Sequence, residues 1–130
     1  MPHFHIDYSP NLEGRLDIAQ LCRVIAETAR ETELFPAAGI RVRATACTHV
    51  YMADGDPKHA FIDMSVRLRA GRPAEAKVAA TETIFAAMQG YCQQLLDSGS
   101  LMLSMEMRDI DPDLSPKTSS IRKYLPEDMR

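Results

Sequence analysis

Two successive strand–helix–strand patterns constrain the fold of this chain more than any other feature. Apolar side chains alternate in the strand patterns and recur at helical spacing in the helix patterns. The predicted strands cover about residues 4–8, 40–46, 60–68 and 101–107, and the predicted helices cover about 12–31 and 74–96. Each β-α-β unit should join parallel strands through its helix. Two units therefore predict an α/β (α+β) fold, in which a four-stranded mixed sheet carries two helices on one face.

A faint repeat supports this division into two units. The segment His5–Ser9 is similar to Phe61–Ser65, and Leu12 aligns with Leu68 in the same register. The repeat suggests an internal duplication. In the second unit the apolar side of the helix is predicted to include Val78, Ile84, Phe85, Met88, Tyr91, Cys92 and Leu95.

The sheet face opposite the helices is predicted to be polar. Nothing within one chain is left to cover this face, so either solvent or a symmetric oligomer covers it. Its predicted residues are Arg41, Arg43, Thr45, Asp63, Ser65, Ser104 and Glu106. The neighbouring arginines Arg41 and Arg43 fit either a solvated face or a positively charged wall for an anionic ligand.

Length and composition limit the remaining possibilities. A chain of 130 residues suits one domain, and a net charge of -3 without a basic stripe argues against nucleic acid as a partner. The chain has no apolar run long enough to cross a membrane and no secretory signal pattern, so we expect a cytoplasmic location. The cysteines and histidines show no metal-binding spacing, so no metal is expected.

The last part of the chain differs in character from the rest. From Asp109 onward it contains Pro112, Pro116 and Pro126 and is rich in Ser, Lys and Asp. We therefore expect a domain over residues 1–108 and an extension over residues 109–130. This extension is either loose or an arm that lies on a neighbouring subunit.

Proline at position 2 is the leading candidate for chemistry. An initiator Met before a small residue is usually removed, which would leave Pro2 with a free secondary amine. An α-amino group has an unperturbed pKa of about 7.7–8.0, and apolar surroundings lower that pKa further. A strand that begins directly after Pro2 would hold this amine in one place, as a general base suited to neutral pH.

Four motifs together resemble one family, the 5-carboxymethyl-2-hydroxymuconate isomerases of the tautomerase superfamily. The motifs are Met1–Phe4, Phe35–Arg43, Met52–Gly55 and Ala70–Arg72. The resemblance implies a tautomerase-like fold, a homotrimer with sites between subunits, and a cofactor-free proton shift in the breakdown of homoprotocatechuate. The chain departs from the family pattern at Asp63, where a histidine is expected, and matches loosely after Asp109.

The resemblance also assigns roles to particular residues. It makes Pro2 the general base and then acid, and it makes Arg41 and Arg72 carboxylate-binding groups. Arg41 is also expected to stabilise developing negative charge, and is therefore grouped with Pro2 as catalytic. Arg43 is a further substrate-binding candidate, or else it forms an ion pair between subunits.

Other functions fit the same residues. The chain could be a tautomerase for another unsaturated keto acid. It could also be a tautomerase-fold protein that binds small anions without turnover, or a solitary ferredoxin-like domain without a pocket.

Overall fold

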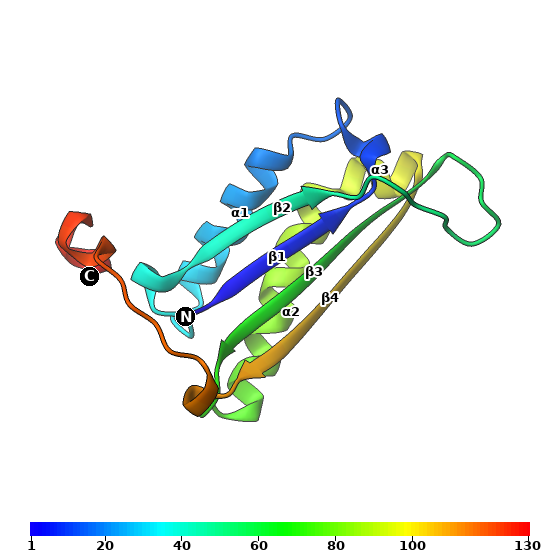
Figure 1. Ribbon diagram of the computed structural model, residues 1–130. Helices are drawn as coiled ribbons and strands as arrows, with labels where there is room; N and C mark the ends of the chain where they lie inside the picture. The colour runs from blue at the N-terminus through cyan, green and yellow to red at the C-terminus, as the bar shows by residue number, and fades with distance from the viewer.

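The computed structural model describes residues 1–130, and its elements follow the predicted order (Figure 1). Short 3-10 turns cover Pro10–Leu12, Ala37–Gly39, Pro112–Leu114, Ile121–Tyr124 and Glu127–Met129. The strands are β1 (His3–Tyr8), β2 (Arg41–Ala46), β3 (His59–Arg69) and β4 (Ser100–Ile110), and the helices are α1 (Ile18–Glu31), α2 (Ala74–Tyr91) and α3 (Gln93–Ser98).

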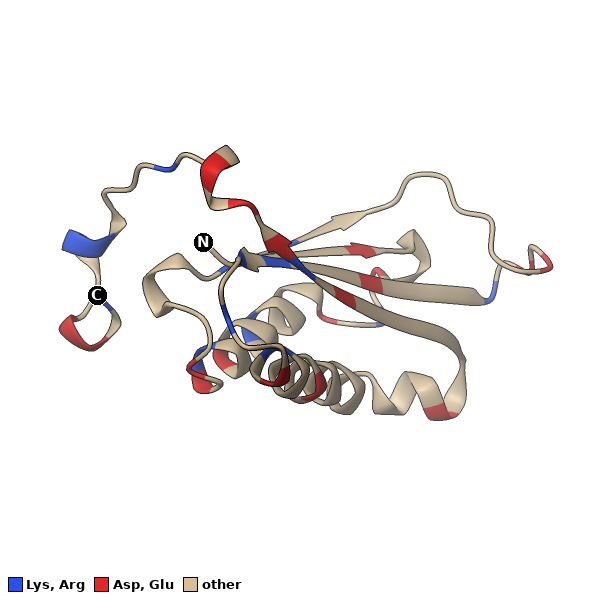
Figure 2. Cartoon of the chain, turned by 90° about the horizontal axis from the view of Figure 1, so that it is seen from below, with Lys and Arg blue, Asp and Glu red and all other residues tan.

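The sheet confirms the prediction of two strand–helix–strand units. Its four strands lie in the order β2-β1-β3-β4. Within each unit the strands are parallel, β1 with β2 and β3 with β4, while β1 and β3 meet antiparallel at the centre. Figure 2 shows α1 and α2 together on one face of the mixed sheet, with the other face uncovered.

The central strand pairing has the register that a duplication about a two-fold axis requires. Asp7 pairs with Asp63, and these two residues are equivalent in the sequence repeat. Both strands begin with histidine, His3 in β1 and His59 in β3. The helices α1 and α2 also begin equally far along the chain from Asp7 and Asp63.

The core lies between the sheet and the helices. One set of alternate side chains in β1 and β3 is fully or almost fully buried there, as the alternation predicted. Burial of each large apolar side chain stabilises the fold by about 1.5–3 kcal/mol relative to exposure. The largest of these buried side chains are Phe4, Ile6, Leu12, Leu21, Ile25, Ile62, Met64, Leu68, Ile84 and Met88.

The first helix begins later than predicted. Residues from Leu12 were expected to be helical, but α1 starts at Ile18. Gly14 has φ of 78°, which is incompatible with a right-handed helix, and Asp17 then caps α1 by accepting a hydrogen bond from the Gln20 backbone N–H.

The second predicted helix is divided in two. It breaks at Cys92, whose φ and ψ are -96° and 4°, so that α2 ends at Tyr91 and α3 follows. Gly90 weakens the last turn of α2 because glycine is a poor helix former. The prediction that Val78 lies on the apolar side was wrong, because Val78 is 56% exposed and Ala80 is buried in its place.

Beyond β4 the chain continues as an arm over residues 111–130. The strand itself extends to Ile110 and so includes the first two residues of the predicted extension. Figure 1 shows the arm leaving the end of β4 and passing the N-terminus. An ion pair between Arg30 of α1 and Asp128 (2.8 Å) holds its far end. No helix is long and apolar enough to cross a membrane.

Candidate active site

The N-terminus lies where three parts of the chain converge. His3, the first residue of β1, pairs with Arg41 at the start of β2 and with Arg67 near the end of β3. Met1 and Pro2 therefore precede β1 at the end of the sheet where β2 begins and β3 ends. Three further segments approach this end of the sheet: the 3-10 turn before β2, the turn after β3 and the arm after β4.

Pro2 is fully buried, and Gly39 is the residue that allows this. A Cβ atom added at Gly39 would lie 3.0 Å from Pro2 Cδ and 3.5 Å from the Met1 nitrogen. Two residues further along β1, the ring of Phe4 packs edge to face against the ring of Phe35, with centroids 5.1 Å apart. Pro2 is thus buried against Gly39 and precedes a strand that is anchored in the core.

A cavity of about 330 Å³ opens beside Met1. Its charged side chains are all basic: Arg41 from β2, and Lys117 and Arg122 from the arm. None of these three side chains forms an ion pair, and Arg41 Nε only donates to the Gly39 carbonyl oxygen at 3.3 Å. A cavity with several unpaired cations and no acidic group is suited to an anionic ligand.

The same surroundings act on the terminal amine. Burial, followed by the positive charges of Lys117, Arg41, Arg72 and Arg69, lowers the pKa of the Met1 α-amino group from 8.0 to about 6. Both effects disfavour the ammonium form. At pH 7 an amine with such a pKa is largely the free base.

Arg72 lies at the same end of the sheet but does not line the cavity. It stands in the turn after β3, where Nη1 donates to the Arg69 carbonyl oxygen (2.8 Å) and Nε to the Leu34 carbonyl oxygen (3.4 Å). These bonds fix the guanidinium close enough to act on the amine electrostatically.

Arg43 is separated from the cavity and lies on the uncovered sheet face. Its Nη1 is 3.4 Å from Nδ1 of His3. Burial and the charges of Arg41, Arg67 and Arg43 lower the pKa of His3 to about 4. His3 is therefore neutral at physiological pH, and it forms an uncharged polar contact with Arg43 among the arginines that surround it.

Sequence patterns missed three features of this site: the contact of Gly39, the position of Lys117, and the neutral state of His3. Two of them gave a signal through the family resemblance: Gly39 lies within the Phe35–Arg43 motif, and Lys117 is one of the residues on which the looser match after Asp109 rests. Lys117 stands far along the chain from Pro2, and no spacing rule connects the two.

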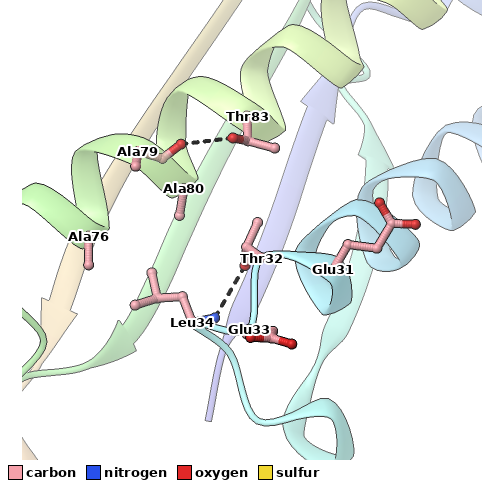
Figure 3. A pocket seen from close by; sticks show the side chains of 8 residues that line it. All are labelled: Glu31, Thr32, Glu33, Leu34, Ala76, Ala79, Ala80 and Thr83. Carbon is pink, nitrogen blue, oxygen red and sulfur yellow. Dashed lines mark hydrogen bonds between the residues drawn. The ribbon is translucent and has the colours of Figure 1, made fainter.

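A larger hollow of about 660 Å³ lies elsewhere, between the end of α1 and α2 (Figure 3). Its only ionisable side chains are Glu31 and Glu33. The hydroxyl groups of Thr32 and Thr83 already donate to the backbone carbonyls of Ala29 and Ala79. The hollow thus has no cationic side chain for binding an anion.

The fold and the site together define the class of this protein. A four-stranded mixed sheet built from two β-α-β units is the fold of the tautomerase superfamily. Residues 2–125 match the family of 5-carboxymethyl-2-hydroxymuconate isomerases. The chain belongs to this isomerase family and is an enzyme.

Individual relatives agree with this assignment. The chain is 32% identical to 5-carboxymethyl-2-hydroxymuconate Delta-isomerase of Escherichia coli, over 93% of this chain and 96% of the relative. A crystal structure of a 5-carboxymethyl-2-hydroxymuconate isomerase from Deinococcus radiodurans R1 has 26% identity and a TM-score of 0.87, covering 96% of this chain and 95% of that one. A third solved structure, a 5-carboxymethyl-2-hydroxymuconate delta-isomerase, has 26% identity and a TM-score of 0.89, covering 95% and 92%.

Proposed function

We propose that this enzyme isomerises a 2-hydroxymuconate-type unsaturated acid, with 5-carboxymethyl-2-hydroxymuconate as the first candidate, and that Pro2 is its general base and acid. One observation carries the proposal: the α-amine of Met1, the residue next to Pro2, lies in a cationic cavity, and burial and the cations lower its pKa to about 6. The names of the relatives supply the substrate class.

The proposed base is the Pro2 amine after removal of Met1. Pro2 lies one residue further into the fold than Met1 and is fully buried, whereas Met1 is only partly buried. Desolvation and the neighbouring cations should therefore lower the pKa of the Pro2 amine in the same direction. With Met1 retained, the Pro2 nitrogen is an amide and has no basic lone pair.

The proton shift needs one mobile base and fixed cations. The free amine removes the proton of the substrate 2-hydroxyl, and the negative charge spreads through the conjugated chain. The resulting ammonium then returns a proton to a distant carbon, which completes the shift to the keto isomer. Arg41 beside the amine binds a carboxylate and stabilises the dienolate charge, and Arg72 binds a more remote carboxylate.

The same chemistry fits other unsaturated keto acids. The cationic cavity also fits a protein that binds small anions without turnover. Arg43 stays a lesser binding candidate, because it lies on the uncovered sheet face beside His3. A cytoplasmic location stays a prediction.

We also propose a homotrimer in which the uncovered sheet faces meet and the arm packs on a neighbouring subunit. Several large apolar side chains lack cover within one chain, including Met102 on the uncovered face (62% exposed) and Leu114 and Tyr124 on the arm (80% and 76%). Because burial of apolar surface drives association, a symmetric assembly would stabilise these groups. Light scattering with size-exclusion chromatography tests this, and a stable monomer at micromolar concentration would contradict it.

The decisive experiment compares three N-termini by ultraviolet assay on a panel of 2-hydroxymuconates, each N-terminus verified by intact mass. Protein that begins at Pro2 should be active, with kcat/KM rising with pH through an apparent pKa below 8. Protein with one alanine inserted before Pro2 should be nearly inert, although it keeps an α-amine. A Pro2→Ala variant should retain partial activity through its primary amine. Equal rates for all three would exclude Pro2 as the base.

A further inference from the structure

The arm over residues 111–130 contributes two of the three charged side chains that line the cavity. Lys117 and Arg122 line the cavity together with Met1 and Arg41. The cavity holds no carboxylate, and neither arm cation has an acidic partner elsewhere in the chain. Clustering unpaired cations without a counter-ion is electrostatically unfavourable unless an anion joins them.

The arm is attached on both sides of Lys117. At its start, Asp111 caps the 3-10 turn by accepting from the Asp113 backbone N–H, and Ser115 Oγ donates back to the Asp111 carbonyl oxygen (2.6 Å). At its end, Asp128 is held by Arg30. The stretch between these two attachments passes Met1 (Figure 1).

The arm cations also differ from one another in their surroundings. Lys123 lies with Nζ 5.1 Å from the ring centroid of Tyr124 and does not line the cavity. Lys117 forms no such contact, and among the charged groups it has the largest effect on the terminal amine. Lys123 therefore serves as a matched control, a lysine on the same arm that is directed elsewhere.

We infer that Lys117, assisted by Arg122, is a substrate-binding residue that binds a carboxylate of the substrate different from the one bound by Arg41. This inference deepens the proposed function and rests on it. It assigns the site to acids with at least two well-separated carboxylates, since cations from β2 and from the arm approach the cavity from different elements. A monocarboxylate would leave one set of cations unpaired.

The test uses full-length protein that begins at Pro2 and compares Lys117→Gln, Lys117→Arg and Lys123→Gln with the unmodified enzyme. For a tricarboxylate 2-hydroxymuconate, Lys117→Gln should raise KM about tenfold or more while kcat changes little, as expected for a lost charge-assisted hydrogen bond. Lys117→Arg should retain most of the affinity, and Lys123→Gln should be unchanged.

Calorimetry with two stable probes separates this inference from the proposed function. Propane-1,2,3-tricarboxylate should bind the unmodified protein more tightly than glutarate, and Lys117→Gln should remove most of that difference. If the unmodified enzyme turned over no 2-hydroxymuconate, the proposed function would be refuted. The calorimetric comparison would still show whether Lys117 binds a carboxylate. The inference would be overturned if Lys117→Gln left both KM and the probe affinities unchanged, or if it changed kcat alone. It would also be overturned if Lys123→Gln weakened substrate binding as much as Lys117→Gln does.

Discussion

Replacing Gly39 by alanine should displace the amine that we propose as the base. The added Cβ would lie 3.0 Å from Pro2 Cδ, closer than nearly all such contacts, so the proline must move by a few tenths of an ångström. Cδ is bonded directly to the proline nitrogen, and the nitrogen therefore moves with it. Since a misplacement of about 1 Å can cost about a hundredfold in rate, we expect kcat/KM to fall about three- to tenfold.

The effect on stability should be smaller than the effect on activity. Overpacking a well-packed site costs about 1–3 kcal/mol. Gly39 does not have a positive φ, so alanine also restricts the unfolded chain and regains about 0.4–1 kcal/mol. The net loss in the free energy of unfolding should be about 0–2.5 kcal/mol, measured by urea denaturation.

Gly90 supplies the control for this experiment. It lies in α2, and a Cβ added there has nothing within 4 Å. Gly90→Ala should leave kcat/KM unchanged and stabilise the protein by about 0.5–1 kcal/mol, because alanine is the better helix former. Wild-type kcat/KM in a Gly39→Ala variant with a verified Pro2 terminus would show that the contact does not position the base, and would refute this reasoning.

Three further predictions concern charge and packing. Arg41→Ala should cost about 2–4 kcal/mol in kcat/KM, whereas Arg72→Ala should raise KM more than it lowers kcat, and near-normal kinetics in both variants would refute their assignment. The lowered pKa of His3 means that the unfolded chain binds a proton first as the pH falls, so stability should decrease from pH 6.5 toward pH 4. A His3→Gln variant should flatten that decrease in urea titrations, and an unchanged slope would contradict the lowered pKa of His3. Met88→Ala should destabilise by about 2–5 kcal/mol because Met88 is fully buried, while Val78→Ala should change stability by less than about 0.5 kcal/mol, and equal effects would contradict the assigned core.

The fold could be predicted from the sequence because its determinants are local. Strand alternation fixes which side chains face the helices. The expected face is buried in β1 and β3 and partly buried in the outer strands β2 and β4, where Ala46 is exposed. Helix ends were less predictable, since Gly14 and Cys92 act through individual backbone angles that apolar periodicity does not reveal. At the site, the position of Pro2 follows from its place before a strand. Lys117 could not be placed in the site from the sequence, because its position depends on the path by which the arm over residues 111–130 passes the cavity beside Met1.

The chain has one candidate base although its fold contains two similar β-α-β units. In the register of the repeat, the position equivalent to Pro2 is Lys58, directly before β3. The Lys58 nitrogen is an internal amide whose N–H donates to Asp56 Oδ1 at 2.9 Å, so it cannot accept a proton. In the strand pairing, Arg41 lies opposite His3, and Ser100 lies opposite the equivalent His59, so an uncharged residue stands where the first unit has an arginine. The second end of the sheet therefore lacks both the free amine and an equivalent of Arg41, the two groups that we propose for the site.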